Sequence, residues 1–127
     1  MQEQSFYDIF GGEPAVRTLV DRFYDLMDLE PHAAQIRALH PESLEGSREK
    51  LFEFLSGWLG GPSLYIAKRG HPRMRARHLP FAIGESERDA WLRCMDQAVA
   101  ETLPAGPARE AFLKALHDFA DHMRNQD

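Results

Sequence analysis

Residues 16–27, with the sequence VRTLVDRFYDLM, decide the fold class of this chain. Their apolar side chains recur with the spacing of one face of an amphipathic helix, at Val16, Leu19, Val20, Phe23, Tyr24 and Met27. Pro14 suits the first turn of such a helix, because a backbone N–H at that position would have no partner within the helix. We therefore predict a long helix that starts near Pro14 and ends before Pro31.

Similar signals place shorter and longer helices on both sides of this stretch. Residues 5–12, SFYDIFGG, predict a short helix that Ser5 caps and the two glycines end. A short helix is expected over residues 32–39, stopped by Pro41. A longer one ends at the Gly-Gly-Pro run of residues 60–62, and its apolar face comprises Ser47, Leu51, Phe54, Leu55, Trp58 and Leu59.

Two longer helices complete the pattern. We expect Ser86 to cap the first, with Asp89 as its partner in a capping box. The turn PAGP at residues 104–107 separates it from the second. The two apolar faces comprise Trp91, Cys94, Met95, Ala98, Val99 and Thr102, and then Phe112, Leu113, Leu116, Phe119, Ala120 and Met123. Since no stretch alternates like a strand, the prediction is an all-α fold with antiparallel helix pairs.

Length and composition limit the class of protein further. The 127 residues, 43% apolar and 28% charged, predict one globular domain over residues 1–127. No apolar run approaches the roughly 18 residues of a membrane span, and the start, MQEQ, lacks the features of a secretory signal. We therefore expect a cytoplasmic protein without a membrane partner. The net charge of −5 argues against broad nucleic-acid binding, and the single cysteine excludes an internal disulfide.

Residues 60–84 break the helical pattern and carry the most suggestive side chains. The stretch is rich in Gly, Pro and Arg, and long irregular stretches of compact domains are usually functional or disordered. Five of the fifteen basic residues of the chain lie between positions 68 and 77. His78 follows them and precedes the apolar sequence LPF. Taken alone, such a histidine is most often an ordinary side chain, but imidazole is also a common iron ligand.

Three requirements of a haem are matched by residues of this chain. A haem needs an axial imidazole, an apolar slot and cations near its propionates. His78 supplies the imidazole and the arginine cluster of residues 69–77 supplies the cations. The apolar candidates form two groups, Phe54, Leu55 and Trp58 in one and Phe81 and Ile83 in the other.

Several motifs occur in a specific order along nearly the whole chain. They are SFYD at residues 5–8 followed by Gly11-Gly12, RFY at 22–24, Trp58 through GGP at 60–62, RGHPRMR at 69–75, RHLPF at 77–81 and ERDAWLRCM at 87–95. Each alone is weak, but together they are specific. In these motifs the chain resembles the truncated haemoglobins, and in particular their second group.

The resemblance implies a shortened globin in which two antiparallel helix pairs sandwich a haem b, iron protoporphyrin IX. His78 matches the proximal iron ligand of the family, whose other ring nitrogen needs a hydrogen-bond partner. Trp91 matches the tryptophan that marks the second group, on the ligand side of the haem. Tyr24, His40 and Ser47 match the remaining distal positions.

The distal residues explain how such a protein would hold oxygen. An oxygen ligand on ferrous iron takes on partial negative charge, so the phenol of Tyr24, the indole of Trp91 and the imidazole of His40 are candidate donors. Each buried bond is worth about 0.5–1.5 kcal/mol, and two would slow release roughly ten- to a hundredfold. Ser47 is small, which suggests an open route to the iron. A core tyrosine and a surface-loop histidine are the alternatives for Tyr24 and His40.

The cofactor itself would contact charged and apolar side chains. Arg77 and Lys50 are candidates for pairing with the propionates, with a solvated charge as the alternative for Lys50. Leu51, Phe54 and Phe81 are the candidates for contact with the macrocycle.

Three functions are compatible with these residues. The first is reversible binding of O2, NO and CO, with slow release. The second is a haem enzyme that consumes NO with oxygen or turns over peroxide, with a reductase as a possible partner. The third is a haem-free helical regulatory module. The sequence is compatible with either a monomer or a homodimer.

Overall fold

The computed structural model describes residues 4–126 and contains helices but no strand within that range. Residues 1–3 and residue 127 lie outside the described range. The expectation about a secretory signal rests partly on residues 1–3. In chain order the helices are α1 (Phe6–Phe10), α2 (Glu13–Leu29), the 3-10 turn η1 (Pro31–Ala33), α3 (Ala34–Arg37), α4 (Glu45–Trp58), α5 (Leu64–Arg69), α6 (Met74–His78), α7 (Glu85–Thr102) and α8 (Pro107–His122). The predicted all-α class is confirmed.

Helix α2 is the centre of the core, as its apolar periodicity predicts. All six residues of the predicted face are buried, and Phe23 is completely inaccessible to solvent. The helix packs mainly against α7 and also against α4. Burial of large apolar side chains is the main favourable contribution to folding, so this face fixes where the neighbouring helices lie.

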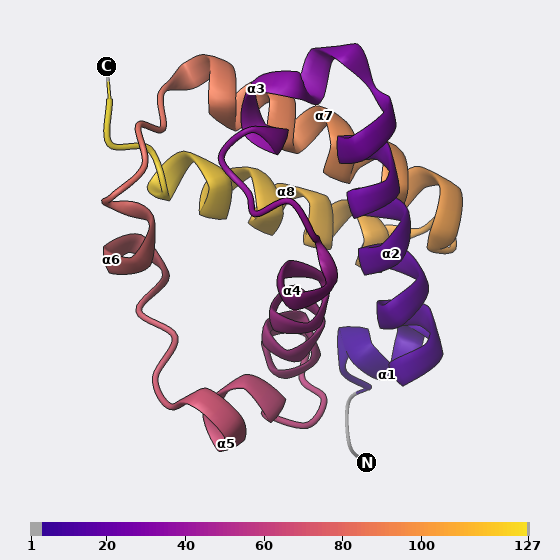
Figure 1. Ribbon diagram of the computed structural model, residues 1–127. Helices are drawn as coiled ribbons and strands as arrows, with labels where there is room; N and C mark the ends of the chain where they lie inside the picture. Colours follow the sequence, from indigo (N-terminus) through magenta and orange to yellow (C-terminus); the bar gives the residue numbers. More distant parts are fainter. Residues whose placement is uncertain (1–3, 127) are drawn as a thin grey trace.

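The helices form two antiparallel pairs, α2 with α4 and α7 with α8 (Figure 1). The short connection of residues 103–106 turns the chain back between α7 and α8, so the two helices run in opposite directions. The remaining helices are short. Of these, α6 lies at the left of Figure 1, on the side of the bundle away from the long helix α2.

Helix α1 confirms the caps expected from its sequence. The Ser5 side chain accepts a hydrogen bond from the Asp8 backbone N–H at 3.2 Å. Gly11 ends the helix with a φ of 114°, in the left-handed region where glycine is favoured.

Three local predictions were wrong. Residues 60–84 contain α5 and α6, which the sequence did not reveal because five or six residues are too few to show a helical period. Helix α7 begins at Glu85 rather than after Ser86, and Glu87, not Asp89, accepts the hydrogen bond from the Gly84 N–H at 2.7 Å. In α4 the buried face is turned from the predicted one and includes Phe52, Glu53 and Ser56.

Among residues 4–126, no helix is both long enough and apolar enough to cross a membrane.

Candidate functional site

A cavity of about 460 Å³ lies between α2, α4, α6, α7 and α8, within the range typical of small-molecule sites. Its lining is mainly apolar, with a few polar groups. The ten residues to which the family resemblance gives a role all contribute to this lining: Tyr24, His40, Ser47, Lys50, Leu51, Phe54, Arg77, His78, Phe81 and Trp91. They come from six different parts of the chain, and the fold brings them together.

His78, the last residue of α6, is prepared to act as a ligand through one ring nitrogen. Its Nδ1 lies 2.6 Å from the backbone carbonyl oxygen of Met74. Because a carbonyl oxygen only accepts hydrogen bonds, Nδ1 carries the proton and donates it. The neutral ring therefore has its lone pair on Nε2, the atom available to a metal.

Tyr24 carries a hydroxyl group into the same cavity from the core helix α2. Its side chain is 6% exposed, and its ring makes edge contacts with Phe23 at 4.9 Å and His40 at 6.0 Å between centroids. Burial raises the pKa of this hydroxyl, although the charge of Arg48 opposes the shift, so the phenol keeps its proton. Within residues 4–126 the structure shows no hydrogen bond from it, which leaves the O–H free to donate to a ligand.

Trp91 lines the cavity from α7 and is held by the same core. Its ring contacts Phe23 edge-on, with 5.2 Å between centroids. One phenylalanine thus packs against both Tyr24 and Trp91. Ser47 lies in the first turn of α4 and is half-buried.

His40 has a different hydrogen-bonding state from the one expected. Its Nδ1 lies 2.8 Å from the carbonyl oxygen of Ile36, so Nδ1 is the protonated nitrogen and Nε2 of the neutral ring is an acceptor. Burial lowers the pKa of His40 against the opposing effect of the hydrogen bond to Ile36, and the charge of Arg37 lowers it further. A second N–H donor on this ring therefore requires a protonation that its surroundings disfavour.

The two predicted cations lie at the cavity in exposed positions. Arg77 donates from Nε to the Pro72 carbonyl oxygen at 2.6 Å, which fixes the guanidinium near the chain that leads into α6. Its guanidinium carbon is 5.9 Å from the centroid of the Tyr65 ring. Lys50 is exposed on α4. Both can reach an anionic group at the rim of the cavity while remaining solvated.

Part of the lining was not predicted from the sequence, and two residues predicted for the apolar slot lie elsewhere. The missed residues include Ile36, Leu39, Tyr65, Met74, Phe119, Ala120 and Met123. Three of these, Phe119, Ala120 and Met123, belong to the predicted apolar face of α8, so their periodicity was a signal. Leu55 is buried in the core, and Trp58 packs on Phe112 and Phe119; neither lines the cavity. Trp58 lies one turn beyond Phe54, at the end of α4, where it contacts α8 and remains partly exposed.

These residues fit a haem. His78 presents an Nε2 lone pair from α6, and Tyr24, His40 and Trp91 place polar rings on other walls, which is the chemistry of an axial ligand and of ligand contacts. Leu39 and Phe81 at the cavity remain 36% and 41% exposed, so large apolar surfaces are available for a flat apolar group to cover. Lys50 and Arg77 suit its carboxylates.

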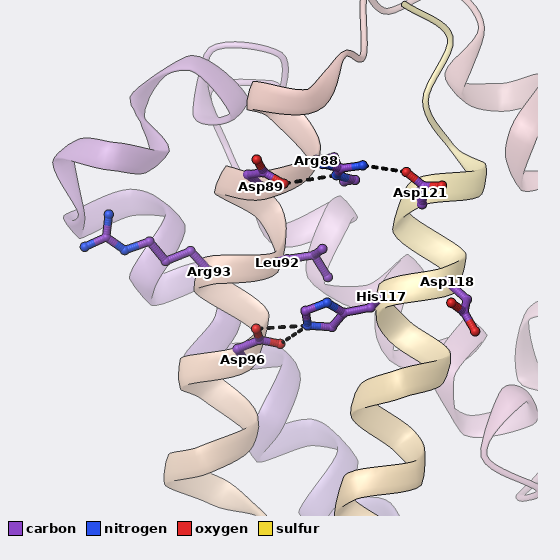
Figure 2. Close-up of a pocket in the computed structure, with 8 residues that line it drawn as sticks. All are labelled: Arg88, Asp89, Leu92, Arg93, Asp96, His117, Asp118 and Asp121. Carbon is purple, nitrogen blue, oxygen red and sulfur yellow. Dashed lines mark hydrogen bonds and ion pairs between the residues drawn. The ribbon is translucent and has the colours of Figure 1, made fainter. Parts of the chain in front are cut away.

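A second concavity, of about 610 Å³, lies between α7 and α8 and is open to solvent (Figure 2). Its charged side chains mostly pair with one another. His117 Nε2 lies 2.9 Å from Asp96, while Arg88 bonds to Asp89 and Asp121. Such exposed pairs form a solvated surface without an apolar slot. The cavity around His78 is therefore the candidate site.

Known proteins are similar to this chain both in sequence and in the arrangement of their helices. A model of the bacterial-like globin family matches residues 5–125. The group 2 truncated haemoglobin YjbI of Bacillus subtilis is 40% identical over 115 residues, which make up 91% of this chain and 85% of that protein.

Solved structures give the same result. A group II 2-on-2 haemoglobin from Agrobacterium tumefaciens has a TM-score of 0.96 and 43% identity, covering 100% of this chain and 98% of that one. A truncated oxygen-avid haemoglobin from Bacillus subtilis has a TM-score of 0.88 and 38% identity, covering 96% of this chain and all of that one. The family match, the identity and the two helix pairs agree, and the chain belongs to the group II truncated haemoglobins, globins that bind small ligands at a haem.

Proposed function

We propose that this chain binds O2 reversibly, and NO and CO in the same manner, at the iron of a haem b that His78 holds. The observation that carries the proposal is the lone pair on His78 Nε2, in a cavity that also contains the hydroxyl of Tyr24 and the indole of Trp91. When bound, the haem supplies an iron atom with one coordination position open to a diatomic ligand. The Bacillus subtilis relative described as oxygen-avid supports oxygen as the ligand.

His78 is the proposed axial ligand, and its hydrogen bond determines how it acts. Donation from Nδ1 to the Met74 carbonyl keeps the ring in one tautomer and limits its rotation. The same bond increases the electron density on Nε2 and makes it a better ligand. A noncovalent haem b fits this arrangement, because a haem attached through thioethers requires a C-x-x-C-H motif and the chain has one cysteine, buried Cys94.

Tyr24 and Trp91 are the proposed donors to the ligand. Each O–H or N–H bond to a partly negative oxygen is worth about 0.5–1.5 kcal/mol. Because about 1.4 kcal/mol corresponds to a factor of ten, the two together would slow release roughly ten- to a hundredfold. His40, with an acceptor Nε2, is suited to receive a hydrogen bond from a neighbouring hydroxyl or from water in the cavity.

Lys50 and Arg77 are proposed to bind the propionates, and Leu51, Phe54 and Phe81 to contact the macrocycle. The exposed positions of the two cations mean that each pair is screened by solvent and contributes little, up to about 1 kcal/mol. The apolar contacts would therefore dominate retention of the cofactor.

Titration of the purified apoprotein with hemin tests the proposal. We expect one equivalent to produce the strong Soret absorption band, and the reduced complex to bind O2 reversibly and slowly release it when mixed with a scavenger. In Tyr24→Phe, release should be several times faster while the stoichiometry of hemin stays at one. A protein that gains no Soret band, or whose reduced complex does not take up O2, would overturn the proposal.

A further inference from the structure

The segment that carries His78 is not held in place by core packing. None of the five residues of α6 is buried. The residue before it, Arg73, has a φ of 46° and a ψ of 52°, and it is the only non-glycine residue with positive φ among residues 4–126. A short helix without a buried face needs other interactions to keep one position.

Asn125, close to the C-terminus, supplies those interactions through its side chain. Its Nδ2 donates to the carbonyl oxygen of Phe81 at 2.8 Å and to that of His78 at 3.2 Å. Its Oδ1 accepts a hydrogen bond from the backbone N–H of Ile83 at 2.9 Å. One side chain thus links three backbone groups that lie between 42 and 47 residues away along the chain.

The backbone beyond α8 adds two further bonds to the same segment. The N–H groups of Asn125 and Gln126 donate to the Ile83 carbonyl oxygen at 2.8 and 3.0 Å. Figure 1 shows the C-terminal stretch running beside the connection between α6 and α7. Residues 125 and 126 therefore bind the segment that follows His78 through both backbone and side-chain hydrogen bonds.

These partners require the amide of asparagine specifically. Nδ2 donates to the carbonyl oxygen of Phe81 and to that of His78, which also accepts from the Phe81 N–H at 3.0 Å, while Oδ1 accepts from the Ile83 N–H. An asparagine side chain offers two donors on one atom and an acceptor on the other, so only one orientation of Asn125 satisfies all three groups. An aspartate would retain the acceptor but would bring an oxygen against the two carbonyls.

We infer that Asn125 is a positioning residue for the iron ligand: it fixes the backbone of His78 while the Met74 carbonyl fixes its ring. The inference rests on the proposed function, in which His78 Nε2 binds the iron. Held at both its main chain and its Nδ1, the imidazole keeps one orientation. Partners of this outer kind commonly change metal affinity by roughly ten- to a hundredfold when they are removed.

Three variants of the full chain test the inference. Asn125→Ala removes all three side-chain bonds, and Asn125→Asp removes the two donor bonds but keeps the acceptor for Ile83. Gln126→Ala is the matched control, because it shortens the adjacent side chain, whose contact with Asn125 Oδ1 is long at 3.4 Å, and leaves the bonds of Asn125 in place. Helix content by circular dichroism checks that each variant folds.

We expect both Asn125 variants to lose haem to an acceptor protein roughly tenfold faster than the wild type, and Gln126→Ala to match the wild type. The iron–histidine stretching band of the ferrous protein should shift or broaden in the same two variants. In the apoproteins, hydrogen exchange at the Ile83 amide should accelerate in Asn125→Ala and remain slow in Asn125→Asp.

Unchanged haem loss and an unchanged stretching band in both Asn125 variants would overturn the inference. His78→Ala separates that outcome from failure of the proposed function. If His78→Ala loses haem while the Asn125 variants behave like the wild type, only the positioning role is wrong. If His78→Ala keeps haem with the wild-type stretching band, the proposed function itself fails.

Discussion

Two walls of the cavity are built in different ways. The distal wall, Tyr24 of α2 and Trp91 of α7, belongs to helices whose other faces are buried, and Phe23 packs against both rings. The proximal wall, residues 74–83, includes a helix without any buried residue and is tied to the rest of the chain by hydrogen bonds. The comparison indicates that the core fixes Tyr24 and Trp91, the proposed ligand donors, whereas a few polar contacts fix His78, the proposed iron ligand.

Because of this difference, we expect different residues to determine the stability of the apoprotein and the retention of haem. A substitution in the core beneath the distal wall should reduce the free energy of unfolding, because large buried side chains leave cavities when truncated. A substitution in the proximal wall should reduce haem retention and leave the apoprotein nearly as stable, because exposed side chains contribute little to folding. The following variants examine that separation, beginning with the largest expected effect.

His78→Ala is expected to abolish stable haem binding. The apoprotein should keep its free energy of unfolding within about 0.5 kcal/mol, because α6 buries no side chain. Hemin retention on a desalting column and urea denaturation of the apoprotein measure the two effects. His122→Ala, an exposed histidine at the end of α8, is the control and should retain haem. A large loss of apoprotein stability in His78→Ala would contradict the separation.

Phe23→Ala should destabilise the apoprotein by about 3–5 kcal/mol, because the ring is fully buried and its removal leaves a cavity. Phe81→Ala is the matched variant on the proximal wall, where the ring is 41% exposed. We expect it to weaken hemin binding and to change the free energy of unfolding by less than about 1 kcal/mol. Denaturation curves and hemin titrations of both proteins give the comparison, which fails if the two variants destabilise the chain equally.

Trp91→Phe should raise the oxygen dissociation rate by roughly tenfold, because it removes the indole N–H and keeps an aromatic ring against Phe23. Stopped-flow mixing of the oxygen complex with a scavenger measures that rate. Trp58→Phe is the control, since Trp58 lies outside the cavity lining. Equal rates in the wild type and Trp91→Phe would exclude the donor role.

The smallest expected effect concerns Glu53, a residue of α4 whose partners lie on α5. Its carboxylate is buried, with Arg69 Nε at 2.8 Å and Lys68 Nζ at 3.3 Å. The hydrogen bond from Arg69, together with that from Lys68, lowers the pKa of Glu53 from its ordinary value of 4.5, against the opposite effect of burial. The pair therefore stabilises the fold above pH 4.5, and this contribution disappears as the pH falls through the lower pKa of the folded state.

Denaturation of the apoprotein as a function of pH tests this. The wild type should lose stability on acidification below about pH 4.5, and Glu53→Gln should lose less over the same interval. The difference should be small, because solvent screens the partly exposed Arg69 and Lys68. Identical pH profiles would show that the pair does not anchor α5.

Much of the fold was predictable from local patterns. The face of α2, the caps of α1 and the two final helices follow from spacing and from glycine, proline and serine positions. The turned face of α4 was not predictable, because Leu51 and Phe54 line the cavity and are only partly buried where they pack against the core. Buried Glu53 also departs from the expected pattern, because its charged partners Lys68 and Arg69 lie 15 and 16 residues away along the chain.

The sequence by itself determined the helical class, the central role of α2 and the candidates for the haem site, because helical period and short motifs are properties of neighbouring residues. Only the folded structure shows which nitrogen of His40 and of His78 carries the proton, since the rotamer of each ring determines whether it reaches the carbonyl four residues earlier. Only it brought Asn125 to the segment after His78, because contacts between residues so far apart in the chain leave no local pattern.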